Sequence, residues 1–66
     1  MNHKQYRTAL GKLGLSQARA GELFRVGDRT ARRWALDEAR VPYPVAILLN
    51  LLVNKRIKLS DIEALE

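Results

Sequence analysis

A chain of 66 residues without a cysteine has to obtain its stability from side-chain packing, because neither a disulfide nor a thiolate metal site is open to it. This length accommodates one domain, and a domain this small buries only about 60% of the surface that its unfolded chain exposes. His3, the single histidine, argues against a histidine-rich zinc site. We therefore expect one tightly packed domain that binds no metal or cofactor and gains stability from a second copy of itself.

No segment has the composition of a membrane span or a signal peptide. The longest apolar stretch, Val45–Val53, is nine residues long and contains Asn50, whereas a spanning helix needs about 20 residues. The segment Met1–Lys12 lacks the apolar core of a signal peptide. The absence of cysteine also fits a reducing compartment. These features predict a cytoplasmic protein, which would associate with the nucleoid if it binds DNA.

The positive charge is concentrated in the first 40 residues. Nine Lys and Arg face four Asp and Glu there, whereas residues 41–66 carry three of each sign, so the whole excess of +5 lies in the N-terminal part. Localised positive charge concentrates a polyanion near a protein. On charge alone, a nucleic-acid partner and a merely solvated surface are equally good interpretations.

Apolar residues recur at helical spacing along the chain, and no alternating run of β-branched residues predicts a strand. Gly14 has the position of a helix-ending cap, and Pro44 that of a first helical residue. Ser60 and Glu63 form the capping-box pattern S-x-x-E before a short last helix. The spacing predicts an all-α bundle of about five short helices, over Lys4–Leu13, Gln17–Arg25, Asp28–Leu36, Pro44–Arg56 and a segment that begins after Ser60.

The segment Gln17–Ala35 has the pattern of two short helices that cross at a tight turn. Gly21 supplies the small residue that a steep crossing requires, and apolar residues on both helices fill the space between them. These wedge residues are Ala20, Phe24, Val26, Ala31 and Trp34. The pattern presents the second helix at the surface, with Trp34 in the core rather than stacked on a base.

The second helix exposes charged side chains on the side opposite this wedge. They are Asp28, Arg29, Arg32 and Arg33. The fork of an arginine meets O6 and N7 of guanine together, and a carboxylate accepts from the amino group of cytosine. Asp28 is equally placed to orient Arg32, and Thr30 to touch a thymine methyl or a phosphate. The plainer interpretation is a solvated face with an ion pair between Arg33 and Asp37.

The residues of Leu15–Trp34 read L-S-Q-A-R-A-G-E-L-F-R-V-G-D-R-T-A-R-R-W, and this run resembles the helix-turn-helix of Cro/C1-type (XRE-like) repressors of phages and bacteria. Their usual run is L-S-Q, a small residue, an apolar pair, G-V-S and T-x-x-R-W. Helix order and length extend the likeness to a lambda-repressor-like domain over about the whole chain. By this resemblance Gln17 matches a phosphate-clamping glutamine. The start and outer face of the recognition helix are matched by Gly27, Asp28, Arg29, Arg32 and Arg33. We therefore expect backbone contacts from Gln17, Arg19, Gly27 and Thr30, and base contacts from Asp28, Arg29, Arg32 and Arg33.

Three positions need a structure to be interpreted. Arg25 stands where the family usually has a glycine in a left-handed turn, a conformation uncommon for other residues. Gly27 replaces the usual serine or threonine, so the side-chain cap of the recognition helix is lost. Tyr43, between two prolines, either packs on the linker or donates to a phosphate.

The predicted helix Pro44–Arg56 carries more apolar surface than one core-facing stripe needs. Leu49 and its helical neighbours form one face, whereas Ile47 and Leu51 form another. One interpretation is a helix buried in the centre of the bundle. The other, which we prefer, is a homodimer, because repressors of this kind read two half-sites about one DNA turn apart. The interface residues we expect are Ile47, Leu51, Ile57, Leu59 and Ile62.

The leading hypothesis is a dimeric transcriptional repressor that occupies a palindromic operator in double-stranded DNA and blocks polymerase sterically. Its size resembles that of small autoregulatory repressors of phages and mobile elements, such as those encoded beside anti-CRISPR genes. The alternatives are an antitoxin-type module whose apolar C-terminal half binds another protein, and an RNA-binding protein, for which no motif is visible. No catalytic constellation appears in the sequence, so we expect neither an enzyme nor a small-molecule substrate.

Overall fold

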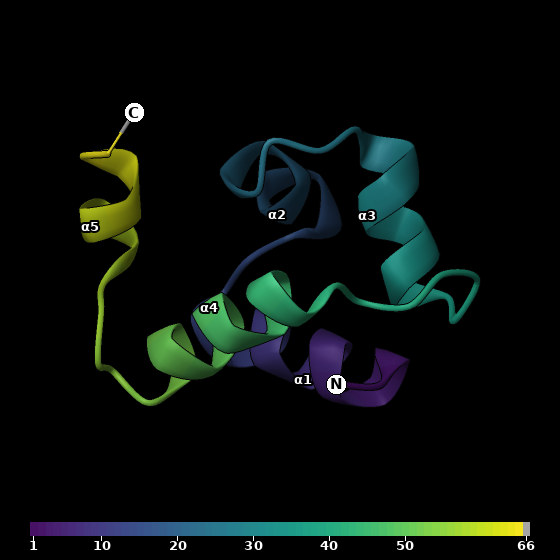
Figure 1. Ribbon diagram of the computed structural model, residues 1–66, viewed down its shortest axis with the longest axis horizontal. Helices are drawn as coiled ribbons and strands as arrows, with labels where there is room; N and C mark the ends of the chain where they lie inside the picture. The colour runs from purple at the N-terminus through teal and green to yellow at the C-terminus, as the bar shows by residue number, and fades with distance from the viewer. Residues whose placement is uncertain (66) are drawn as a thin grey trace.

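The computed structural model describes residues 1–65, which form five short α-helices and no strand (Figure 1). The helices are α1 (His3–Leu13), α2 (Gln17–Leu23), α3 (Asp28–Ala35), α4 (Tyr43–Val53) and α5 (Leu59–Glu63). The radius of gyration of the Cα atoms is 10.9 Å, close to the value of about 11 Å expected for a compact chain of this length. The predicted all-α bundle is confirmed.

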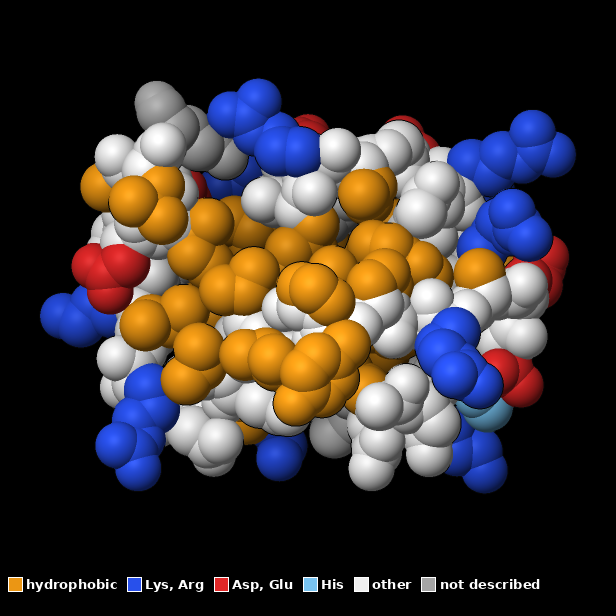
Figure 2. Space-filling view, in the orientation of Figure 1, with side chains coloured by type: hydrophobic (Ala, Val, Ile, Leu, Met, Phe, Trp, Pro, Cys, Tyr) orange, Lys and Arg blue, Asp and Glu red, His pale blue; other side chains and the backbone are white. Residues whose placement is uncertain are grey.

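The helices pack in two pairs, and α5 stands apart from both. α1 lies alongside α4, α2 packs on α3, and α1 also contacts α3 (Figure 1). α5 contributes no buried residue. None of the helices within residues 1–65 is long and apolar enough to cross a membrane. The face seen in Figure 1 carries a broad band of hydrophobic side chains with Lys and Arg gathered at its edges (Figure 2).

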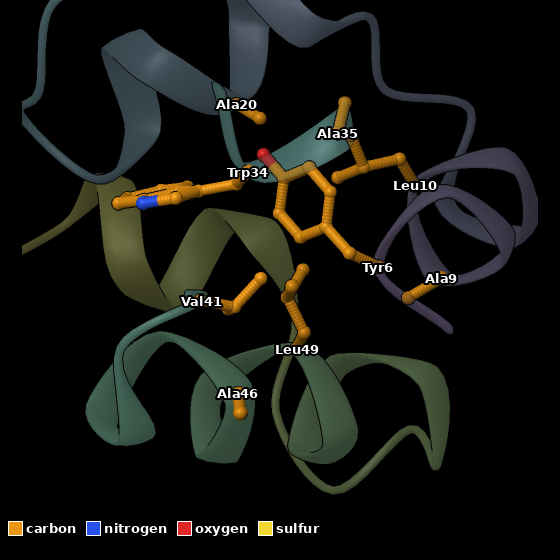
Figure 3. Close-up of a cluster of buried hydrophobic side chains, with 9 residues drawn as sticks. All are labelled: Tyr6, Ala9, Leu10, Ala20, Trp34, Ala35, Val41, Ala46 and Leu49. Atoms are coloured by element: carbon orange, nitrogen blue, oxygen red, sulfur yellow. The ribbon is translucent and has the colours of Figure 1, made fainter. Parts of the chain in front are cut away.

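The core is built around Tyr6, which with Leu49 is one of the two largest fully buried side chains. The Tyr6 ring meets Trp34 edge to face, with ring centroids 5.9 Å apart and an interplanar angle of 82°, a geometry that aromatic pairs favour. Small and branched side chains from the other elements surround the pair, among them Ala20 and Val41 (Figure 3). Trp34 is only 3% exposed, so its prediction as a core residue is confirmed.

The Tyr6 hydroxyl is a polar group in this apolar core. Its oxygen is buried and has no hydrogen-bond partner among the described residues. Burial also raises the pKa of the hydroxyl above its ordinary value of 10.0, because the charged phenolate loses its hydration. A buried donor without a partner costs about 1–3 kcal/mol, so this atom lowers the stability of the fold that its ring supports.

Four helices end at a residue in the left-handed conformation. These residues are Gly14, Arg25, Asp37 and Lys55, with φ of 68°, 57°, 63° and 59°. In each case the N–H of the following residue donates over 2.9 Å to the carbonyl five residues earlier, from Leu15 to Leu10, Val26 to Gly21, Glu38 to Arg33 and Arg56 to Leu51. This is the Schellman motif. The cap predicted at Gly14 is confirmed, and Arg25 adopts a left-handed conformation although it is not a glycine.

The left-handed residues correct two helix boundaries. α2 ends at Leu23 and α4 at Val53, whereas the sequence predicted helix as far as Arg25 and Arg56. The reason is that Arg25 and Lys55 reverse the backbone direction before the apolar periodicity ends.

The caps at the two ends of the chain also differ from the prediction. The capping box of Ser60 and Glu63 is wrong, because α5 begins at Leu59 and Ser60 lies inside it. The cap is made instead by Asp61, whose carboxylate accepts from the Lys58 N–H over 2.9 Å. At the other end, Asn2 and Gln5 form a reciprocal capping box with bonds of 2.8 and 2.9 Å. The sequence contains this N-x-x-Q pattern, which the predicted start of the first helix at Lys4 did not use.

Replacement of Tyr6 by phenylalanine tests the account of the core. At neutral pH we expect Tyr6→Phe to be at least as stable as the natural chain, with a gain of about 1 kcal/mol, because the ring stays and the unpartnered hydroxyl goes. Above pH 10 the Tyr6 side chain ionises in the unfolded chain before it ionises in the folded one. The free energy of unfolding of the natural chain therefore falls as pH rises through the raised pKa of the folded state. The measurement is thermal unfolding between pH 7 and pH 11.

The matched control is Tyr43→Phe, because Tyr43 is 77% exposed. We expect Tyr6→Phe to lose less stability than the natural chain above pH 10 and Tyr43→Phe to follow the natural chain. A loss of several kcal/mol in Tyr6→Phe at neutral pH would show that the hydroxyl has a partner, and would contradict this account.

Candidate nucleic-acid interface

The crossing of α2 and α3 depends on Gly21. A Cβ atom placed on Gly21 would lie 3.2 Å from the carbonyl oxygen of Val26 and 3.5 Å from Cβ of Ala31. Gly21 and Ala31 are both buried, and Ala31 is 0% exposed. The prediction that a small residue at position 21 allows the two helices to approach is confirmed.

The turn between the two helices is held by its backbone and by one apolar side chain. Arg25 has a φ of 57°, which costs a residue with a Cβ about 1 kcal/mol. The N–H of Val26 then donates to the Gly21 carbonyl, and the Val26 side chain packs against the core. The turn therefore starts α3 at a fixed position relative to α2, although no glycine occupies its left-handed residue.

The two faces of α3 differ sharply in burial. Ala31, Trp34 and Ala35 are at most 3% exposed. Arg29, Arg32 and Arg33 are exposed and line an open hollow together with Glu38. Asp28 is exposed as well, but its Oδ1 lies 3.7 Å from the position of a Cβ on Gly21, so it faces α2 and not the side of the arginines as the sequence predicted. The structure thus brings the predicted arginines together on one accessible surface.

Glu38 is a member of this surface that the sequence did not reveal. Its N–H donates over 2.9 Å to the carbonyl of Arg33, which fixes it next to the last turn of α3. The left-handed Asp37 causes this reversal of the chain, and no glycine or asparagine announces it. The Asp37 carboxylate itself lies 3.6 Å from Nδ1 of His3, so it is directed toward α1 rather than along α3 as the alternative of an Arg33–Asp37 pair required.

The residues predicted to contact the DNA backbone lie on different sides of the α2–α3 pair. Gln17 is the first residue of α2, and Thr30 lies in α3; both are exposed. Gly27 caps α3 without a side-chain hydrogen bond. Arg19 forms two surface ion pairs with residues of the same chain. Its guanidinium lies 3.1 Å from a Glu22 oxygen and 2.6 Å from a Glu63 oxygen. Residues two positions apart in a helix point about 200° away from each other around the helix axis. The side chains of Gln17 and Arg19 therefore leave α2 on nearly opposite sides.

The connection between α3 and α4 adds two exposed side chains. Tyr43, the first residue of α4, is 77% exposed, so most of its ring is open to a partner. Arg40 is exposed as well and had no role in the sequence analysis. Arg40 precedes α4, and both side chains line a shared hollow with Val41.

The residues expected to form a dimer interface lie on α4 and on the segment from Ile57 to α5. Ile47, on α4, is 41% exposed. Leu51, Ile57, Leu59 and Ile62 are half-buried. Ile57 and Leu59 line a largely apolar groove of about 310 Å³, whose other lining residues are Leu13, Leu52, Lys55 and Lys58. The structure therefore leaves both an α4 face and a groove near α5 open to a partner.

No protein-family model matches the chain, and no curated protein or solved structure is detectably similar to it. The candidate interface is therefore interpreted from its own residues. Its defining features are a helix anchored by buried residues on one side and a hollow lined by three arginines and Glu38 on the other.

The role of Gly21 is tested by comparing the same substitution at two glycines. Gly21→Val is expected to lower the free energy of unfolding by about 2 kcal/mol, because the added carbons crowd the Val26 carbonyl and Ala31. Gly11→Val is the control, since a Cβ at Gly11 in α1 meets nothing within 4 Å. Chemical denaturation of both variants measures the difference, and equal stabilities would contradict the close crossing of α2 and α3.

Proposed function

We propose that the chain is a sequence-specific DNA-binding transcriptional regulator, in which α2 and α3 form a helix-turn-helix and α3 lies in the major groove. The single observation that carries the proposal is the two-sided character of α3. Its buried side fixes the helix to the domain, and its exposed side presents Arg29, Arg32 and Arg33 around one open hollow. A positively charged, rigidly supported helix is the element that major-groove readers use.

The dimensions of α3 suit this role. An α-helix is about 10–12 Å across with its side chains, which matches the width of the major groove, about 12 Å. The eight residues of α3 extend about 12 Å along the helix axis. Arg29 and Arg33 are four residues apart and therefore about 6 Å apart along the helix axis. That distance covers roughly two steps of 3.4 Å along one DNA strand, so each arginine can meet the O6 and N7 of a different guanine.

Contacts to the DNA backbone would hold α3 in register. Gln17 begins α2, where an amide side chain and unpaired backbone N–H groups suit a phosphate. Thr30 and the start of α3 at Gly27 are exposed and available for the same purpose. Arg19 takes a structural role in this proposal, because its guanidinium is held by Glu22 and Glu63.

The regulator is proposed to act in the cytoplasm as a homodimer on a palindromic operator and to repress by excluding polymerase. The supporting observation is the apolar surface that remains open on α4 and near α5, since exposed apolar patches of this kind mark association sites. The same surface favours a second candidate function, an antitoxin-type module that binds another protein. An isolated chain that stays monomeric and binds no DNA would favour that candidate.

The assignment of the α3 arginines is tested with single alanine variants. On a DNA sequence selected by the protein, Arg29→Ala or Arg33→Ala is expected to lower affinity by about 1–3 kcal/mol and to relax preference at one base pair. Gln17→Ala is expected to weaken selected and random DNA alike, because a phosphate contact carries no sequence information. Fluorescence anisotropy with both DNAs, at one stated salt concentration, measures these differences.

Arg7→Ala is the matched control for net charge, because Arg7 is an exposed cation on α1. We expect it to reduce affinity slightly and without regard to sequence. If Arg29→Ala and Arg33→Ala behave as Arg7→Ala does on both DNAs, the α3 arginines do not read bases and the proposal fails at that point.

A further inference from the structure

α5 is the least anchored element of the fold. None of its residues is buried, and Leu65, just beyond it, is 87% exposed. Figure 1 shows the helix at one end of the molecule, away from the α1–α4 pair. An ion pair of 2.6 Å between Arg19 and Glu63 ties it to α2. A helix of five residues has little stability of its own in water. The half-buried Leu59 and Ile62 and the exposed Leu65 are apolar side chains that a partner could cover.

The groove beside α5 has a complementary shape and chemistry. Its floor is formed by Leu13 from the end of α1 and Leu52 from α4, with Ile57 and Leu59 from the following segment. Its volume of about 310 Å³ holds roughly ten water molecules. Apolar side chains that displaced this water would cover surface that the single chain leaves open.

The charges of the groove and of α5 are opposite. Lys55 and Lys58 are exposed and line the groove. α5 carries Asp61 and Glu63 and no cation between Leu59 and Glu63. An acidic helix with an apolar side and a basic groove with an apolar floor are thus present on the same chain, next to one another but not filling one another.

We propose that the α5 segment of a second copy, with its Ile62 and Leu65, occupies this groove, and that the reciprocal contact is the dimer interface. The inference rests on the homodimer of the proposed function and identifies which of the two open apolar surfaces forms it. A two-fold axis makes each contact occur twice, so both grooves and both α5 segments are covered together. The pair between Arg19 and Glu63 holds α5 in the orientation that presents Leu65 outward.

The competing surface is the exposed face of α4. Ile47 is 41% exposed and Tyr43, one turn earlier, is 77% exposed. Both lie outside the groove. A substitution at Ile47 therefore serves as the matched control for one at Leu65, since both side chains are exposed aliphatic groups of similar size.

Disulfide formation between single-cysteine variants tests the contact directly, because the natural chain contains no cysteine. Leu65→Cys protein is mixed with an equal amount of Lys55→Cys protein and oxidised gently. A mixed disulfide is expected, since a bond requires Cα atoms within about 7 Å and the partner's Leu65 lies at the groove of Lys55 in the proposed dimer. The control mixture of Leu65→Cys with Ile47→Cys is expected to give at most a tenth as much.

Sedimentation equilibrium of two serine variants provides an independent measurement. Leu65→Ser is expected to weaken dimerisation by about tenfold or more, while thermal unfolding of the dilute monomer is unchanged because the side chain is 87% exposed. Ile47→Ser is expected to leave dimerisation within about twofold of the natural chain.

The opposite pattern, in which Ile47→Ser dissociates the dimer or the Ile47 mixture crosslinks, would place the interface on α4 and overturn the inference. A natural chain that remains monomeric up to millimolar concentration would overturn it as well. Fluorescence anisotropy with the selected DNA distinguishes failure of the dimer inference from failure of the proposed function. Sequence-specific binding without the groove dimer contradicts only the inference, whereas a groove dimer without DNA binding contradicts only the proposed function.

Discussion

The edge-to-face contact between Tyr6 and Trp34 is the interaction on which the rest of the molecule depends. Tyr6 comes from α1, which packs against α4, and Trp34 comes from α3, which packs against α2. The two rings, 5.9 Å apart, therefore join the two helix pairs of the bundle. Because Trp34 lies on the inner side of α3, the same contact directs the arginines of that helix outward. The burial of one aromatic residue and the exposure of the proposed DNA-reading surface are two consequences of one packing arrangement.

Left-handed residues give this small bundle its sharp changes of direction. Only one of the four, Gly14, is a glycine, and the others accept the strain of a Cβ in that conformation. Each places the next residue's N–H on a carbonyl of the preceding helix, so four helix ends are satisfied without side-chain caps. The turn at Arg25 sets α3 against α2, and the turn at Asp37 brings Glu38 beside Arg33. The shape of the candidate interface is therefore determined largely by backbone geometry.

The sequence predicted the elements that have a strong periodic signal. The helices, the small contact at Gly21 and the core position of Trp34 follow from spacing alone, because apolar residues at three and four positions apart must share a face. The sequence predicted that the third helix ends before Asp37 but not that Asp37 is left-handed, and it extended α4 past Lys55, since neither residue type marks a left-handed turn. Because these left-handed turns could not be predicted, the sequence did not indicate that Glu38 lies beside Arg33 or that α4 ends at Val53. Arg19, which the sequence predicted at the DNA backbone, pairs with Glu63, forty-four residues away, a contact that no local pattern contains.

The central claim is that α3 reads the major groove of DNA from a two-fold symmetric protein. Selection of bound sequences from a random pool of double-stranded DNA tests it most directly. The account predicts enrichment of a palindrome whose half-sites are about 10 base pairs apart, centre to centre, with guanines at the positions that Arg29 and Arg33 contact. Recovery of sequences that match the composition of the starting pool would contradict it.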